Sequence, residues 1–132
     1  MKKSGILNAE LIKHIAALGH KDLIMIGDAG MPIPKGVEIV DLALCKNIPR
    51  FPQVLDAVLE EMEVEYYYLA EEMEEKNEEM YKYVRETLQN TEFETIKHTD
   101  FKEKSKHCCF AVRTGEFSSY SNIILRSGVV FG

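Results

Sequence analysis

The chain lacks any apolar run long enough to cross a membrane, and it does not begin with a basic segment followed by an apolar one. A membrane-spanning helix needs about 18 or more such residues, so we expect no membrane partner and a cytoplasmic location. Cysteine is scarce as well. Cys45, Cys108 and Cys109 are odd in number and two are adjacent, which fits neither an internal disulfide nor paired zinc ligands. We expect these thiols to be reduced and mostly buried.

Positive charge is also in short supply, because the formal net charge is -6 and acidic residues concentrate between positions 60 and 79. A nucleic-acid backbone would be repelled, so no nucleic-acid partner is expected. The sequence contains neither Gly-x-x-x-x-Gly-Lys nor Gly-x-Gly-x-x-Gly, so no nucleotide cofactor is predicted. No serine lies in a nucleophile-elbow pattern, and His107-Cys108-Cys109 could hold a metal only with distant help.

What the chain does contain is the composition of an ordinary globular protein. Its 132 residues include 45% hydrophobic and 29% charged side chains, which predicts one compact domain over residues 1–132. Helical spacing predicts helices over 8–18, 54–62, 73–88 and 101–106, the first capped by Asn8 and ended by a left-handed Gly19. Short apolar segments predict strands over 21–27, 37–44, 64–69, 92–97, 108–113 and 122–131. Their alternation predicts an α/β fold with helices packed on a mixed, largely parallel sheet.

Polar side chains follow or precede several of these strands. Asp28 follows the first strand, His98 follows the strand that ends near Lys97, and Tyr120 and Asn122 lead into the last one. In open α/β sheets ligands bind beyond the carboxyl ends of strands. Tyr120 and Asn122 would point to the same side of an extended segment, so together these groups would suit a polyhydroxylated ligand.

Each of these residues also has a structural interpretation. Asp28 before Ala-Gly is typical of a turn that bonds its own backbone, and His98 could be a surface residue at a strand end. Tyr120 and Asn122 could be turn and edge residues. His20 after Gly19 could simply be a cation at a helix C-terminus. The residues alone leave these alternatives open.

Taken together, several separated motifs resemble the D-ribose pyranase family along almost the whole chain. They are Leu18-Gly19-His20, Asp28-Ala29-Gly30-Met31-Pro32-Ile33-Pro34, Asp41-Leu42-Ala43-Leu44, Tyr120-Ser121-Asn122-Ile123-Ile124-Leu125 and Gly128-Val129. L-fucose mutarotases share some of these elements, but they tend to carry a histidine and a bulkier aromatic after the alanine. The Gly-Met-Pro-Ile-Pro stretch therefore favours ribose.

The resemblance implies an isomerase that interconverts the pyranose and furanose forms of D-ribose and supplies the furanose for phosphorylation. It makes His20 the general acid, makes Asp28, His98, Tyr120 and Asn122 the sugar contacts, and lets the backbone of Ser121 line the pocket. It implies a cytoplasmic enzyme without a cofactor or metal, and rings of subunits paired into an assembly such as a decamer, with the sugar at subunit boundaries. An L-fucose-type mutarotase and a non-catalytic sugar-binding module are the alternatives.

One geometric constraint applies to this site. If positions 20 to 28 form a straight strand, His20 and Asp28 lie roughly 26 Å apart, which no pentose spans. Either the chain turns sharply between them, or the two residues that meet at one sugar belong to different subunits. Five consecutive apolar residues in the segment, from Leu23 to Gly27, make a turn unattractive and favour a shared site.

Overall fold

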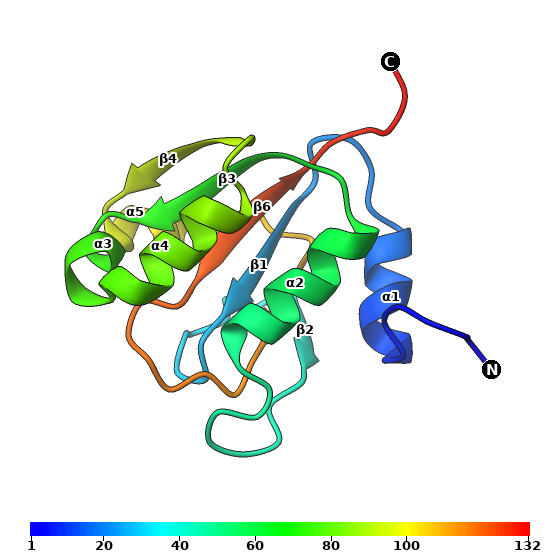
Figure 1. The fold of residues 1–132 in the computed structure, drawn as a ribbon, viewed down its shortest axis with the longest axis horizontal. Helices are drawn as coiled ribbons and strands as arrows, with labels where there is room; N and C mark the ends of the chain where they lie inside the picture. Colours follow the sequence, from blue (N-terminus) through cyan, green and yellow to red (C-terminus); the bar gives the residue numbers. More distant parts are fainter.

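A computed structural model describes all residues, 1–132, and shows one six-stranded sheet with helices on both faces (Figure 1). The predicted α/β class is confirmed. The elements in chain order are α1 (Ala9–Ala16), β1 (Leu23–Gly27), β2 (Glu38–Asp41), α2 (Phe51–Glu61), β3 (Val64–Ala70), α3 (Glu72–Lys76), α4 (Glu78–Thr87), β4 (Glu92–Ile96), α5 (His98–Ser105), β5 (Phe110–Arg113) and β6 (Ile123–Ser127).

The sheet has the strand order β2-β5-β1-β6-β3-β4. β5 is parallel to β2 and β1, and β3 is parallel to β4, whereas β6 runs antiparallel to both of its neighbours, β1 and β3. The sheet is therefore mixed and largely parallel, as predicted. Ile26 of β1 pairs with Ile123 of β6, so β6 begins at the edge of the sheet where β1 ends. A loop that enters β6 thereby meets the loops that leave the parallel strands.

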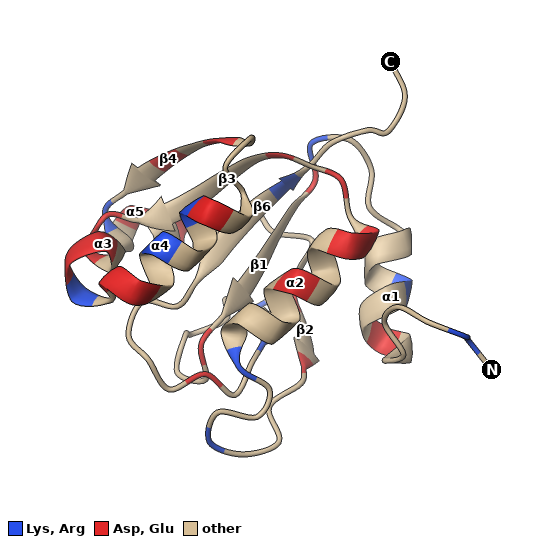
Figure 2. Cartoon of the chain, viewed as in Figure 1, with Lys and Arg blue, Asp and Glu red and all other residues tan.

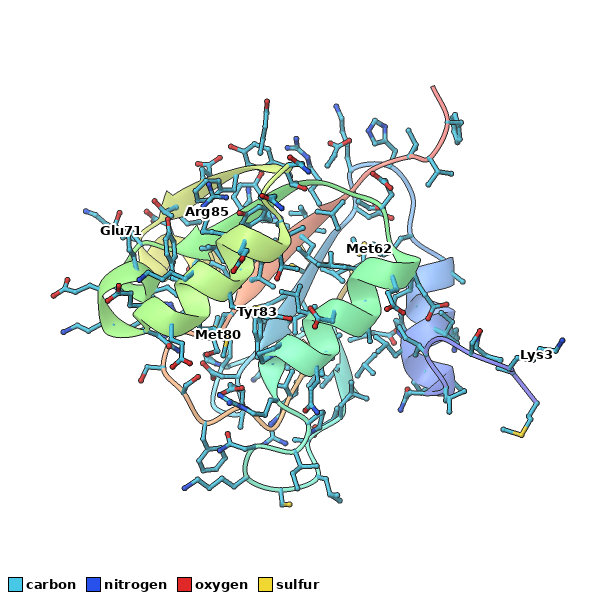
Figure 3. All side chains as sticks on the ribbon, viewed as in Figure 1. Lys3, Met62, Glu71, Met80, Tyr83 and Arg85 are labelled. Carbon is cyan, nitrogen blue, oxygen red and sulfur yellow. The ribbon has the colours of Figure 1, made fainter.

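Each face of the sheet buries its own hydrophobic core. Side chains alternate along β1, so Ile24 and Ile26 face the larger core, which α1, α2 and α4 cover, while Met25 faces a smaller core with Phe101 of α5. Side chains of α2 and α4 pack against the front face of the sheet, and Met80 and Tyr83 are labelled on α4 in Figure 3. These two layers fix the strand ends and the loops between them.

The predicted helices differ from the observed ones in their bounds: the second begins at Phe51 rather than at 54, and the last at His98 rather than at 101. The expected helix over 73–88 is divided at Asn77, whose side chain accepts the Met80 N–H and so begins α4 as a separate helix. The first helix ends at Ala16 with Ala17 as its cap, and the left-handed residue is Lys21 (φ 74°) rather than Gly19. Asn8 does cap α1, by accepting the Leu11 N–H.

The C-terminal strand and the cysteines also differ from expectation. β6 ends at Ser127, and the next residue, Gly128, donates its N–H to the carbonyl of Glu63 instead of extending the ladder. Of the three free thiols only Cys108 is buried, and burial raises its pKa to about 12. Cys45 and Cys109 are exposed, so the expectation of mostly buried cysteines was wrong.

Acidic side chains lie along the outer surfaces of α2, α3 and α4, as their concentration in the sequence indicates (Figure 2). None of the helices has the length and apolar composition that a membrane span requires.

Candidate active site

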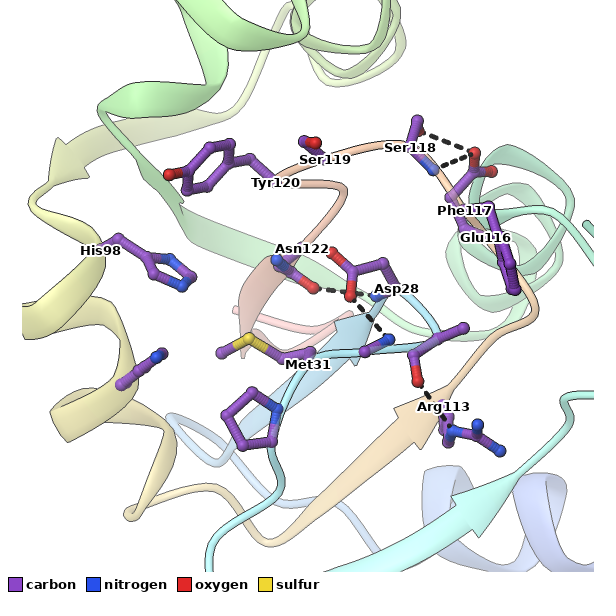
Figure 4. A pocket seen from close by; sticks show the side chains of 14 residues that line it. Asp28, Met31, His98, Arg113, Glu116, Phe117, Ser118, Ser119, Tyr120 and Asn122 are labelled. Carbon is purple, nitrogen blue, oxygen red and sulfur yellow. Dashed lines mark hydrogen bonds between the residues drawn. The ribbon is translucent and has the colours of Figure 1, made fainter.

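An open cavity of about 660 Å³ lies at the edge of the sheet where β1, β4 and β5 end and β6 begins (Figure 4). Ten of its fourteen lining residues are not hydrophobic, so the cavity suits a polar ligand. The side chains with ionisable or amide groups are Asp28, His98, Lys102, Arg113, Glu116, Tyr120 and Asn122. The structure thus brings together four of the residues that the sequence singled out.

Asp28 and Asn122 line the cavity next to each other and are joined by a hydrogen bond. The Asp28 N–H donates to Oδ1 of Asn122 at 2.8 Å, and Oδ1 of Asp28 accepts the Gly30 N–H at 3.0 Å. Burial raises the pKa of Asp28, partly offset by the hydrogen bonds from Gly30, Asn122 and Met31. With its Oδ1 occupied, the Asn122 carboxamide donates through its NH₂ group, whose two N–H bonds can serve both the Asp28 carboxyl and a ligand.

Gly27 permits this arrangement at the end of β1. A Cβ at Gly27 would lie 3.1 Å from Oδ1 of Asn122 and 3.1 Å from Cβ of Met31, which is closer than nine in ten real contacts of a Cβ. The absence of a side chain therefore lets the carboxamide and the Met31 side chain approach the strand end.

His98 enters the cavity from the first turn of α5, and Figure 4 shows its ring pointing across towards Asn122 and Met31. The ring stacks on that of Phe101. It also makes a T-shaped contact with the ring of Tyr120, with 5.1 Å between the centroids of His98 and Tyr120. Its Nδ1 is buried and has no hydrogen-bond partner. A protonated ring would bury an unpaired N–H there, and burial and the Lys102 charge lower the pKa of His98. The imidazole is therefore neutral near pH 7.

Tyr120 reaches the cavity in a different way from the one expected. The extended conformation predicted for this segment was wrong, because Tyr120 has φ 56° and its carbonyl accepts the Asn122 N–H at 2.9 Å in a tight turn. Left-handed backbone at a non-glycine residue is costly and is often found at functional sites. Both side chains nevertheless line the same cavity.

His20 lies outside this cavity, before the opposite end of β1. Its Nε2 lies 2.7 Å from Oε1 of Glu65, and the other oxygen of Glu65 accepts Nε of Arg126 at 2.7 Å. These hydrogen bonds, with that from His20 the larger, lower the pKa of Glu65. About half of the His20 side chain is exposed, at 48%. β1 is unbroken and its five residues alone extend roughly 16 Å, so one chain does not bring His20 to Asp28.

Ser121 is fully buried and is not among the residues that line the cavity. Lys102 and Arg113, in contrast, line it but were not singled out from the sequence. Lys102 lies one helical turn after His98, so both side chains are on the same face of α5. The sequence prediction began this helix at 101 and therefore did not relate the two residues. Arg113 ends β5 and donates from Nε to the Ala29 carbonyl at 3.1 Å, which fastens the loop after Asp28. Arg113 could have been singled out from the sequence, because it is a basic residue at the end of the strand predicted over 108–113.

Known proteins resemble this chain along almost its whole length. A sequence model of the RbsD / FucU transport protein family matches residues 1–130. The chain belongs to this family. Within the RbsD / FucU family, the D-ribose pyranase of Limosilactobacillus fermentum is 46% identical over 131 residues, which make up 99% of this chain and 100% of the relative. The resemblance inferred from the separated motifs is therefore confirmed.

Two solved structures share the fold. Bacillus subtilis RbsD, whose structure is a complex with D-ribose, is 43% identical, with 99% of this chain and 100% of that chain covered and a TM-score of 0.96. The fucose mutarotase of Streptococcus pneumoniae, solved with L-fucose, is 26% identical, with 95% of each chain covered and a TM-score of 0.81.

Proposed function

We propose that this protein is a D-ribose pyranase, which interconverts the pyranose and furanose forms of D-ribose by opening and closing the sugar ring. The observation that carries the proposal is the convergence of Asp28, His98, Tyr120 and Asn122 on one polar cavity. The ribose complex of the 43% identical relative and the name of the 46% identical one support the same substrate. We also propose that the enzyme acts in the cytoplasm, since its furanose product would be used there for phosphorylation.

The reaction consists of proton transfers. The ring oxygen gains a proton as its bond to the anomeric carbon breaks, and the anomeric hydroxyl loses one. Asp28 accepts hydrogen bonds from sugar hydroxyls, and the Asn122 NH₂ and the Tyr120 hydroxyl supply donors. Ser121 lies between these two residues in the chain, and its buried hydroxyl bonds to Asn77 and Ser118. A histidine is suited to donate the proton near neutral pH, and we assign this role to His20.

Because His20 and the cavity lie at opposite ends of β1, we propose that each site takes its His20 from a neighbouring subunit. Exposed apolar side chains near both regions support such contacts. Phe117 at the cavity and Ile48 in the adjoining loop are 61% and 51% exposed. At the other end of β1, Lys21, which follows His20, donates its N–H to the Ser127 carbonyl at the end of β6. The tail that follows Ser127 exposes the Phe131 side chain at 78%. A contact between two different surfaces is head-to-tail, and it closes into a ring when the rotation permits.

Exchange between the anomeric NMR signals of pyranose and furanose, measured by saturation transfer, tests the activity. We expect catalytic amounts of the protein to accelerate this exchange, and His20→Ala to slow it by about 10²- to 10⁴-fold while ribose still binds. His107→Ala, which alters an exposed histidine outside the cavity, is the matched control. Ribose binding without faster exchange would identify a sugar-binding module. Faster exchange of fucose anomers than of ribose ring forms would identify a fucose-type mutarotase, a fold relative of this chain.

Mixing variants tests the shared site. His20→Ala and Asp28→Ala proteins should each be inactive, and subunits exchanged between them should regain activity, because some sites then combine an intact His20 with an intact Asp28. If mixing restores nothing after subunit exchange has been verified, His20 and Asp28 do not meet across a subunit boundary.

A further inference from the structure

The loop between β5 and β6 carries Tyr120 and Asn122, and its second half is held differently from its first half. The first half is fixed to the sheet by backbone and hydroxyl bonds, for example from the Thr114 hydroxyl to the Gly27 carbonyl at 2.8 Å. Residues 118–121 have no such hydrogen bonds to the sheet. Apart from the contact between the Ser118 and Ser121 hydroxyls and the bond from Asn122 to the Tyr120 carbonyl, their hydrogen bonds run to two side chains, those of Glu116 and Asn77.

Glu116 is a carboxylate buried in this loop, with 1% of its surface exposed. Arg50 donates to it from Nε at 3.1 Å and from Nη2 at 2.8 Å, and the N–H of Phe51 at the start of α2 donates at 2.9 Å. A paired, planar guanidinium and a helix N-terminus are groups that stabilise a buried negative charge. Glu116 is therefore fixed to α2 from one side.

From its other side Glu116 holds the sugar-binding turn. Its Oε2 accepts the hydroxyl of Ser118 at 2.7 Å, and that hydroxyl lies 2.7 Å from the hydroxyl of Ser121. Asn77, which caps α4, donates from Nδ2 to the Ser121 hydroxyl at 3.1 Å and to the Ser119 carbonyl at 2.8 Å. One chain of hydrogen bonds thus joins two helix N-termini to the turn on which Tyr120 takes its strained backbone conformation.

We propose that Glu116 and Arg50 are positioning residues, which hold residues 118–121 so that Tyr120 and Asn122 meet the sugar. Neither residue is assigned a proton-transfer role. Their effect passes through Ser118 and Ser121 to the two cavity side chains. The kinetic part of the following test rests on the proposed ribose pyranase function, whereas its spectroscopic part does not.

The first measurement is the NMR signal of the His98 ring. Because this ring meets the edge of Tyr120 at 5.1 Å, its chemical shift reports where Tyr120 lies. We expect Glu116→Gln and Arg50→Ala to move or broaden the His98 signal, and Arg50→Lys to retain part of the wild-type position. Glu78→Gln, which breaks an exposed ion pair with Lys82, is the matched control and should leave the signal unchanged. An unchanged His98 signal in folded Glu116→Gln protein would overturn the proposal.

The second measurement is ribose kinetics well below the unfolding temperature of each variant. Glu116→Gln should raise KM about tenfold or more and change kcat much less, because binding contacts move while the proposed acid His20 lies elsewhere. A variant with reduced thermal stability but wild-type KM would show that the role is only structural. If Glu116→Gln does not fold, Ser118→Ala, which removes the link from Glu116 to Ser121, decides by the same two measurements. Failure of wild-type protein to exchange ribose would refute the proposed function and leave the His98 measurement decisive for Glu116.

Discussion

The buried charge of Glu116 should make the free energy of unfolding depend on pH by an amount that can be calculated. Burial by itself would raise the pKa of this carboxyl, but the hydrogen bonds from Arg50, Phe51 and Ser118 outweigh burial and hold the pKa at about 2, against 4.5 ordinarily. A group whose pKa is lowered on folding stabilises the protein above its unfolded pKa. That contribution is lost as the pH falls through the folded pKa. For Glu116 it amounts to about 3 kcal/mol at neutral pH.

Glutamine at position 116 has the same shape and cannot titrate. The free energy of unfolding in urea, measured from pH 7 to pH 2 at fixed protein concentration and ionic strength, should therefore differ most between wild type and Glu116→Gln at neutral pH. The difference should shrink by about 3 kcal/mol between pH 5 and pH 2. Glu78→Gln should show a much weaker trend, because its ion pair is exposed. Parallel curves for wild type and Glu116→Gln would refute the reasoning.

Three further predictions concern other parts of the fold. Gly27→Ala should weaken ribose binding at least about tenfold by calorimetry, because the new Cβ would press on Asn122 and Met31 at 3.1 Å; unchanged affinity would mean that the strand end tolerates the methyl group. Leu69→Ala should lower the free energy of unfolding by about 2–5 kcal/mol, since Leu69 is fully buried, whereas Leu7→Ala at an exposed position should change it little. His14 has its pKa raised by hydrogen bonds to the Glu10 carbonyl and then to Glu38, so its stabilisation is complete below pH 6.5 and is lost as the pH rises through the raised value. The melting temperatures of wild type and His14→Gln should therefore converge with rising pH, and a constant difference between pH 6 and pH 8 would contradict this.

Much of the sheet could be predicted because its signals are local. The apolar run before Gly27 predicts a buried strand, and Asp28 directly after it belongs to the edge where the parallel strands end. His98 was placed after a strand, and it does follow β4, but the structure puts it in the first turn of α5, with its N–H bonded to the side chain of Glu72. That partner is distant in sequence, so no pattern near His98 reveals the helix start.

The support of the site could not be predicted for the same reason. Arg50 and Glu116 are 66 positions apart, and neither belongs to a recognisable motif. Asn77 interrupts a stripe of apolar residues that continues on both sides of it, so spacing alone predicts one long helix where two exist. The separation of His20 from Asp28, by contrast, followed from strand geometry alone, because an unbroken strand has a fixed rise per residue.

That separation has a consequence for how the enzyme would behave on dilution. With the proposed acid at one end of β1 and the proposed sugar-binding cavity at the other, a lone subunit would hold two halves of different sites and no complete one. Specific activity would then depend on protein concentration and fall steeply below the dissociation constant of the subunit contact. Rates measured at high dilution would report the strength of that contact as much as the chemistry of ring opening.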